Sequence, residues 1–364
     1  MAYTTIDDPS AHFQATLYAS TGNGADITVT NNGNSDLQPD WLWIKCRNGA
    51  NNHDTFDSSR GITSKRLFPN LTNVEDSNGI GSVTSNGFTT GTSIGNINNT
   101  SGANTYVAWQ WKMNGGTTTS GGGTDSAGTS TFQANTTAGQ SIVTYTGTGS
   151  SMTVAHGLGA TPKLIFIKKR TDDTEDWRVY HHLAYKEDSY GQQQSGGRLN
   201  TTNPFDHGAN SYWDNTAFSS TLFTVKDNAT VNDNTDTYVA YCFAEIKGYS
   251  KFGYYTANNI TDGPFLYLGF KPKFMIFKKV GTTEEWFLLD TSRDVNNPVD
   301  TTLYASGAYT EGTGAQIMDW CSNGVKLRNN HTGTNGENTG EEFVYMAWAE
   351  SPFVSSEGVP TTAR

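Results

Sequence analysis

Large apolar residues occur along this chain in short runs, and one run appears three times in similar form. Each copy opens with a proline, continues through apolar or aromatic residues and reaches a lysine six positions later: Pro39 to Lys45, Pro162 to Lys168 and Pro272 to Lys278. Such a run, bounded by turn residues, is typical of a buried β-strand, and proline suits its first position. Three copies predict a triplicated β domain.

The residues around each copy also repeat in a constant order. An expected opening strand precedes each proline (13–19, 141–147 and 252–257), and an aromatic closing segment follows it (106–111, 238–243 and 343–348). Asp57 and Asp290 lie at the same distance from their prolines, and each has an arginine three residues on. We interpret the recurring residues as structural anchors of the repeat: Pro39, Lys45, Asp57, Arg60, Pro162, Lys168, Pro272, Lys278, Asp290 and Arg293.

The repeats divide the chain into a polar leader (1–12), module 1 (13–113), module 2 (131–248), module 3 (249–353) and a polar tail (354–364). Residues 114–130 are rich in Gly, Ser and Thr, which predicts a flexible linker and a spatially independent module 1. Modules 2 and 3 lack such a linker, so we expect them to pack directly together. The three modules could also surround a pseudo-threefold axis, so that one chain imitates a trimer.

Composition favours an all-β protein of three tandem β-sandwich-like modules with long polar loops. Only 16% of the residues are charged, 12% are aromatic, and Gly, Asn, Thr and Ser are abundant. This composition differs from that of disordered chains and suits short strands joined by polar turns.

Charge and residue usage exclude several classes of function. The net charge of −11 disfavours nucleic acid as a partner, because phosphate binding needs clustered cations. We interpret Lys168-Lys169-Arg170 as a solvated strand end and not as a phosphate site. Three cysteines imply no disulfide framework, and no apolar run is long enough to span a membrane. The N-terminus resembles no signal peptide, so we expect a protein made in a cytosol and released by lysis.

The candidate polar chemistry is sparse. Asp57 with Arg60, and Asp290 with Arg293, could form a polar site for a sugar or a cation. The alternative, which we favour, is an ion pair that satisfies backbone groups at a turn; the middle copy has His181 and Ala184 there. The histidines lack the spacing of a zinc site, so we expect no metal and no cofactor.

Most tryptophans lie in the repeated strands, where their counterparts are also apolar, so we assign them to the core. Tyr212, Trp213 and Trp320 lie outside the clean repeats, among polar residues. Aromatic rings beside amides and carboxylates can stack on sugar rings and bind their hydroxyls. Together with Asp214, these residues form our predicted ligand site.

The repeated phrase, the His53–Arg60 segment, the Asn86-Gly-Phe-Thr strand, the Tyr106–Trp111 closing phrase and the opening MAYTTIDDPSAHFQATLY resemble a repeat domain of virion proteins of tailed phages that infect aquatic bacteria. This resemblance implies a non-enzymatic structural component of the particle. The expected role is a tail fibre or tail-associated host-recognition protein, with other virion proteins and a host-surface glycan or protein as partners. We also expect a homo-oligomer, with a trimer as one form.

Two alternatives to the tail protein stay open. One is a head decoration or head fibre protein, in which the same modules would grip the capsid. The other is a polysaccharide depolymerase, which would need two carboxylates flanking a glycosidic bond. No spacing among the 35 acidic residues singles out such a pair.

Overall fold

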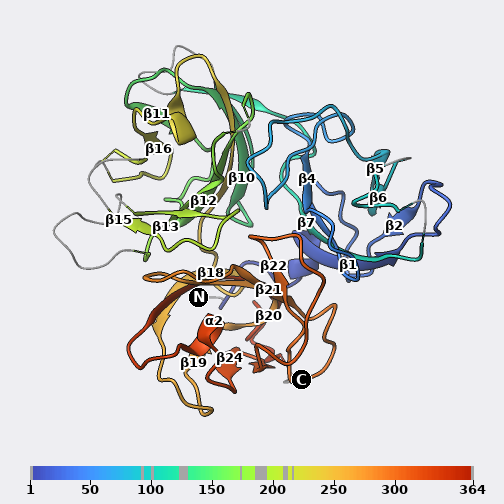
Figure 1. Cartoon of the computed structure of the whole chain (residues 1–364), viewed down its shortest axis with the longest axis vertical. Coiled ribbons are helices and arrows are strands. Elements are labelled where there is room, and N and C mark those ends of the chain that lie inside the picture. The colour runs from blue at the N-terminus through green and yellow to red at the C-terminus, as the bar shows by residue number, and fades with distance from the viewer. Residues whose placement is uncertain are drawn as a thin grey trace.

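The computed structural model describes residues 3–91, 94–99, 102–122, 130–172, 174–184, 195–207, 212–214 and 217–361. Strands make up 40% of the described residues and helical segments 3%, so the predicted all-β class is confirmed. The helical segments are single turns: η1 (Pro9–Ala11), α1 (Ala229–Asn232) and α2 (Thr332–Asn335). Figure 1 shows three lobes of antiparallel strands around a common centre.

Each lobe contains a main sheet and a small sheet. In module 1 the main sheet has the order β1 (Phe13–Ala19), β7 (Thr105–Trp111), β3 (Trp41–Cys46), β4 (Asp54–Asp57), and the small sheet β2 (Thr28–Thr30), β6 (Gly87–Thr89), β5 (Ser82–Thr84). In module 2 the main sheet has the order β15 (Asp206–His207), β14 (Ser195–Arg198), β13 (Arg178–His181), β12 (Leu164–Lys169), β17 (Thr237–Phe243), β10 (Gln140–Thr146), β9 (Ser130–Asn135), β8 (Thr119–Gly121), and the small sheet β11 (Met152–Ala155), β16 (Leu222–Val225). In module 3 the main sheet has the order β18 (Ser250–Thr256), β25 (Glu342–Pro352), β20 (Phe270–Lys279), β21 (Phe287–Asp290), β22 (Leu303–Tyr304), and the small sheet β19 (Phe265–Tyr267), β24 (Gly324–Leu327), β23 (Met318–Cys321).

The strand register identifies equivalent positions in the three modules. In each main sheet the closing strand lies between the opening strand and the proline-led strand. The row that crosses these three strands near the centre of the molecule is Phe13–Trp111–Trp41 in module 1, Gln140–Phe243–Leu164 in module 2 and Ser250–Trp348–Phe274 in module 3. The next strand pairs Trp41 with Asp57, Leu164 with His181 and Phe274 with Asp290, so these last residues are counterparts.

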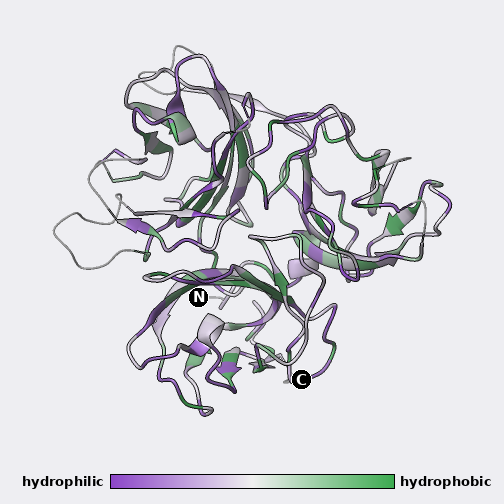
Figure 2. Cartoon of the chain, viewed as in Figure 1, coloured by the Kyte–Doolittle hydropathy of each residue, from purple (hydrophilic) through white to green (hydrophobic). Residues whose placement is uncertain are grey.

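Both faces of each main sheet are buried, which explains why its strands are apolar at consecutive positions. In β3, Leu42 and Ile44 pack with Phe88 of the small sheet inside module 1. Trp41 and Trp43 alternate with them and face the centre of the molecule. Figure 2 shows the hydrophobic residues concentrated in the strands, with the polar residues in the loops.

Three counterpart aromatic residues meet where the modules join. Trp111, Phe243 and Trp348 are at most 1% exposed, and every pair packs edge to face, with ring centroids 6.4, 5.6 and 5.3 Å apart. Aromatic pairs favour this geometry because the positive edge of one ring meets the negative face of another. The three modules therefore share one core.

The expectation of a spatially independent module 1 is wrong. Trp41 of module 1 stacks on Tyr241 of module 2 at 4.2 Å, and Trp109 stacks on Phe274 of module 3 at 5.0 Å. These contacts cover the aromatic face of module 1, which would otherwise be exposed to water.

The module boundaries repeat the same contact in a cycle. A ring nitrogen near the start of β4, β13 or β21 lies 2.8–2.9 Å from a backbone carbonyl of the preceding module: Trp177 Nε1 to Phe68 O, Trp286 Nε1 to Arg198 O and His53 Nε2 to Tyr304 O. Module 2 thus contacts module 1, module 3 contacts module 2, and module 1 contacts module 3. The chain closes into a ring about a pseudo-threefold axis.

The flexible linker predicted for residues 114–130 is wrong where the structure describes it. Thr119–Gly121 form β8, which pairs with β9 at the edge of the main sheet of module 2. Serine and threonine are compatible with an edge strand, and composition alone does not reveal that a strand partner is available. Residues 123–129 lie outside the described part.

One further expectation, that each proline begins its strand, needs correction. The strands β3 and β12 begin two residues after Pro39 and Pro162, whereas Pro272 lies inside β20 at an irregularity of the pairing with β25, where proline is tolerated.

The leader packs on other parts of the chain. Thr4 Oγ1 donates a hydrogen bond to Lys247 O (2.9 Å), and Asp7 binds Ser356 of the tail.

Candidate functional site

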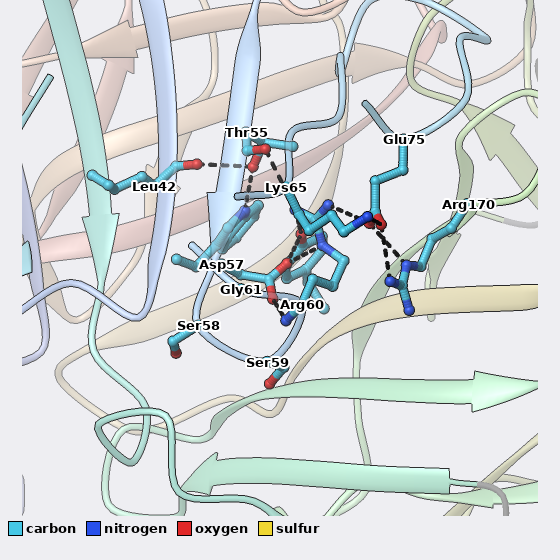
Figure 3. Close-up of polar contacts among 12 residues, drawn as sticks. Leu42, Thr55, Asp57, Ser58, Ser59, Arg60, Gly61, Lys65, Glu75 and Arg170 are labelled. Atoms are coloured by element: carbon cyan, nitrogen blue, oxygen red, sulfur yellow. Dashed lines mark hydrogen bonds and ion pairs between the residues drawn. The ribbon is translucent and has the colours of Figure 1, made fainter. Parts of the chain in front are cut away.

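Asp57 and Arg60 form a buried ion pair at the turn after β4 (Figure 3). Asp57 Oδ1 accepts the backbone N–H of Arg60 at 2.9 Å, and Asp57 Oδ2 accepts its Nε–H. Arg60 also donates to Thr55 O at 3.4 Å. Both side chains are 0% exposed, so the pair binds the turn to the strand and leaves no open coordination site.

The same pair connects module 1 to module 2. Tyr241 of β17 donates its hydroxyl to Asp57 Oδ2 at 2.6 Å. Arg60 Nη1 lies 2.9 Å from Glu75, whose carboxylate also binds Arg170 at 2.9 and 3.0 Å (Figure 3). Two anions and two cations therefore alternate across the boundary, and Lys65 Nζ adds a third cation 3.6 Å from Glu75.

The pKa values in this network follow from burial and charge pairing. Burial alone would lower the pKa of Arg60, but Asp57, Tyr241 and Glu75 outweigh it and raise the pKa above its ordinary value. Burial opposes ionisation of Glu75, yet Arg170 and Arg60 hold its pKa below the usual range. Burial raises the pKa of Tyr241, so it stays a hydroxyl donor. Arg60 and Glu75 are thus held in their charged forms and Tyr241 in its neutral form, and each has a hydrogen-bond partner in the network.

The other two boundaries use the counterpart positions differently. Between modules 3 and 1, Asp290 binds the backbone and Nε of Arg293 and accepts Trp109 Nε1 at 3.1 Å. Between modules 2 and 3, His181 Nε2 lies 3.3 Å from Tyr345 O. Burial, with His182 beside it, lowers the pKa of His181 to about 3, so the ring stays neutral.

These contacts decide between the two interpretations of the Asp–Arg pairs. A sugar or cation site is wrong for both, because all four side chains are 0% exposed and their charges are already paired. The favoured alternative, an ion pair that satisfies a turn, agrees with the geometry.

The three repeated lysines are also buried and structural. Lys168 Nζ donates to Thr72 O and Glu175 O, both at 2.8 Å, and Lys278 Nζ donates to Thr202 O at 3.0 Å and Glu284 O at 2.5 Å. Each of these two lysines joins its module to the preceding one. Lys45 Nζ instead donates to carbonyls of its own module, Cys46 O and Gly49 O, at 2.6 and 3.1 Å. Burial lowers the pKa to about 8 for Lys45, about 8 for Lys168 and about 7 for Lys278.

The basic run at the end of β12 is not the solvated strand end that we expected. Lys169 Nζ lies 2.6 Å from Asp172 and 2.6 Å from Asp236, and its side chain is buried. Arg170 binds Glu75, as described above. Every cation of the run therefore has carbonyl or carboxylate partners, which leaves no cluster for a phosphate.

The predicted ligand site is contradicted by burial. Trp213 and Trp320 are 0% exposed and Tyr212 is 8% exposed, so none can stack on a sugar. Tyr212 lies under the Arg178 guanidinium at 3.6 Å and donates to Asp206, while Trp213 Nε1 donates to Ser195 O. Asp214 is half-buried beside them. Strands β13, β14 and β15 cover Tyr212 and Trp213 through Arg178, Ser195 and Asp206, and Trp320 is part of strand β23, so these rings are core residues and not surface residues.

Two grooves at module boundaries were not predicted from the sequence. One, of about 370 Å³, lies between modules 3 and 1 and is lined by Ser10, Phe13–Ala15, Asn32–Asn34, Lys273 and Ala349–Ser351. The other, of about 510 Å³, lies between modules 2 and 3 and is lined by Tyr3, Glu245, Lys247, Gly248, Ser250, Lys251 and Tyr267–Gly269. The first groove joins residues 10–34 to Lys273 and residues 349–351, and the second joins Tyr3 to residues 245–269, so no local pattern identifies either groove.

The second groove has exposed aromatic residues, whereas the sequence predicted such a surface at Tyr212, Trp213 and Trp320. Tyr267 is 51% exposed, and its hydroxyl lies 3.4 Å from that of Tyr3. The ammonium groups of Lys247 and Lys251 lie 4.4 and 5.5 Å from the centres of the Tyr3 and Tyr267 rings. Aromatic faces next to cations can take up a polar ring that carries negative charge.

Within the described residues, no three His, Cys, Asp or Glu side chains gather where they could share a metal ion. None of the described helices has the length and apolar character needed to cross a bilayer.

Comparison with known proteins returned one finding. Neither the curated proteins nor the solved structures gave a match. The family described as "Domain of unknown function (DUF7483)" matches residues 8–352, which include the three modules and the end of the leader. That span agrees with a single ring built on one core. The chain belongs to the DUF7483 family.

Proposed function

We propose that this chain is a non-enzymatic structural protein of a phage virion, attached to the tail and engaged in host recognition. The observation that carries the proposal is the closed ring, in which one chain places counterpart strands three times around an axis. Such a ring matches a position of threefold symmetry, for example the end of a trimeric fibre, because symmetric assemblies present repeated surfaces. The shared aromatic core keeps the loops in constant relative positions.

Host contact is assigned to the groove of Tyr3 and Tyr267. Its half-exposed tyrosines supply faces for a sugar ring, and Lys247 and Lys251 supply charge for an acidic group on that sugar. A groove of this kind binds weakly on its own, and several copies on one particle would multiply the affinity. The partner class is therefore an acidic glycan on the host surface.

The pseudo-threefold axis also favours a second candidate, a head decoration protein. Capsid lattices contain local threefold positions, and a chain that imitates a trimer could occupy one of them with a single copy. In that case a homotrimer would not be needed to match the symmetry.

Immunogold labelling of intact particles with an antibody to residues 131–353 tests both candidates. Gold on the tail is expected, and gold over the head would instead support decoration. Absence of the chain from gradient-purified particles, checked by immunoblot, would overturn the virion assignment itself. Particles of an unrelated phage serve as the control for nonspecific labelling.

A further inference from the structure

The outer face of the small sheet in module 3 carries two exposed aromatic side chains. Strand β19 forms an edge of that sheet, and its three residues alternate in burial. Leu266 is 4% exposed and faces the core, whereas Phe265 and Tyr267 lie on the opposite face and are 45% and 51% exposed. Adjacent large apolar side chains that stay open to water mark a candidate binding surface.

The other two modules show that the fold does not require aromatic residues at these positions. In each small sheet one residue of the first strand is buried and pairs with a buried residue of the next strand: Leu266 with Val325, Val29 with Phe88, and Val154 with Phe223. The two residues that flank this position lie on the other face of the strand: Phe265 and Tyr267 in β19, Thr28 and Thr30 in β2, Thr153 and Ala155 in β11. Threonine and alanine suffice in two modules, so the aromatic residues of module 3 serve a purpose other than folding.

Phe265 extends the groove of Tyr3 and Tyr267 along the strand. Tyr267 lines that groove, and Phe265 lies two positions before it on the same face, about 7 Å away along the strand. The Phe265 ring reaches over Gly324, the residue opposite Tyr267, since a Cβ on this glycine would lie 3.0 Å from Phe265 Cζ. The two rings therefore lie next to each other on the same open surface.

The Tyr267 end of this surface carries unpaired positive charge. The ammonium groups of Lys247 and Lys251 lie near the tyrosine rings, and neither forms an ion pair with any residue that the structure describes. The carboxylate of Glu245, which also lines the groove, accepts the backbone N–H of Phe252 at 2.8 Å. Two cations and one anion therefore line this end, which favours a ligand group with negative charge.

At the Phe265 end the charges are paired. Lys326 lies opposite Phe265 in the register, and its Nζ is 2.6 Å from the carboxylate of Asp262 and donates to Gly263 O. This end has no charge left to match, so it suits a neutral ring. The Asp262 side chain is 79% exposed, and its carboxylate can accept hydrogen bonds from hydroxyl groups.

We propose that this surface binds two consecutive sugars of a glycan, an acidic sugar over Tyr267 and a neutral sugar over Phe265. Sugar rings pack their C–H faces on aromatic rings, and two sugars joined by one bridging oxygen span the about 7 Å between outward positions of a strand. The inference rests on the proposed function, because it assigns the second sugar and the direction of the glycan in the same groove. Phe265 is the residue that selects an acidic sugar with a neutral neighbour.

The test compares three probes on the purified full chain by NMR titration. They are glucuronic acid, cellobiouronic acid, in which glucuronic acid is linked to glucose, and uncharged cellobiose. Cellobiouronic acid should bind about 3- to 10-fold more tightly than glucuronic acid, because the glucose ring adds one aromatic contact. Cellobiose should bind more weakly than cellobiouronic acid because it lacks the carboxylate. The amide signals that shift should include those of residues 265–269.

Three variants assign these affinities to side chains. Phe265→Thr, which introduces the residue that modules 1 and 2 have at this position, should reduce the affinity for cellobiouronic acid to that for glucuronic acid. Lys251→Ala should weaken the binding of both acids. Tyr309→Thr removes a 55% exposed ring elsewhere in module 3 and should change neither affinity. Circular dichroism and the unshifted amide signals establish that each variant is folded.

The results that would overturn the proposal differ in what else they reject. Equal affinities of the wild type for the two acids, or no loss in Phe265→Thr, would reject the second sugar and leave the acidic-glycan groove standing. Absence of saturable binding of both acids would reject the groove itself, and with it the host-contact part of the proposed function. Self-association of the chain in sedimentation experiments, abolished by Phe265→Thr, would make the aromatic face a contact between copies and would also overturn the proposal.

Discussion

At the scale of single residues, recurring polar groups in this chain serve the backbone. The three lysines donate to carbonyls, and the Asp–Arg pairs cap turns. A lysine buried in this way is held in an environment that disfavours its charge, so its pKa lies below the ordinary value of 10.5. Residue identity alone did not distinguish such a lysine from a surface cation.

The lowered pKa of Lys278 predicts that the stability of the chain depends on pH. Its folded-state pKa is about 7, so between pH 7 and 10.5 the unfolded chain holds a proton that the folded chain has lost. The free energy of unfolding should therefore rise with pH over this window, by up to about 1.4 kcal/mol per pH unit from this residue. Urea denaturation of the wild type and of Lys278→Met from pH 7 to 9.5 measures it.

Lys278→Met should lose the part of the rise in unfolding free energy with pH that Lys278 contributes. Lys168→Met is the matched comparison, and because the pKa of Lys168 is about 8, its share of the slope should begin about one unit higher. Equal slopes in the wild type and both variants would contradict a charged-to-neutral change in these lysines.

At the scale of elements, burial on both faces decides the sequence of the main strands. Leu42 and Ile44 face one core and Trp41 and Trp43 face another, so these four consecutive positions are all apolar. The outer strands of module 2 are positioned differently. β9, which lies between β10 and the edge strand β8, has a mixed sequence, and pairing with β10 and the amide of Gln133 hold it in place.

Gln133→Ala should destabilise the chain by about 1–3 kcal/mol, because four polar groups of module 1 and the adjoining segment lose their partner. Hydrogen exchange should increase in residues 130–135 more than elsewhere. Thr131→Val, which removes only the contact with Thr144 inside module 2, is the control and should have a smaller effect. Unchanged exchange in β9 would show that Gln133 does not hold the strand.

At the scale of the whole molecule, the three modules form one body with a shared core. Trp111, Phe243 and Trp348 meet at the axis, and each boundary repeats the same contact. A module taken out of the ring would expose the aromatic face of its main sheet. Large apolar faces of that kind are not stable in water.

We therefore expect residues 13–113 made alone to lack a cooperative thermal transition and to bind a hydrophobic dye. In the full chain, Phe243→Ala should lower stability by about 3–5 kcal/mol and shift a single transition. Hydrogen exchange should then increase in all three modules and not in module 2 alone. A sharp transition of the isolated fragment, with native near-ultraviolet circular dichroism, would show that module 1 is independent after all.

The sequence by itself determined the all-β class, the recurrence of the proline-led strands and their aromatic partners, and the structural reading of the Asp–Arg pairs. These are local properties, because strand periodicity and turn chemistry depend on residues that are close in the sequence. Only the tertiary structure decided that the three modules close on one core, that Tyr212, Trp213 and Trp320 are buried, that Thr119–Gly121 form a strand, and that open grooves lie at two boundaries. Each of those depends on which segments, distant in the sequence, cover a given surface. The identity of a residue therefore does not by itself determine whether it is buried.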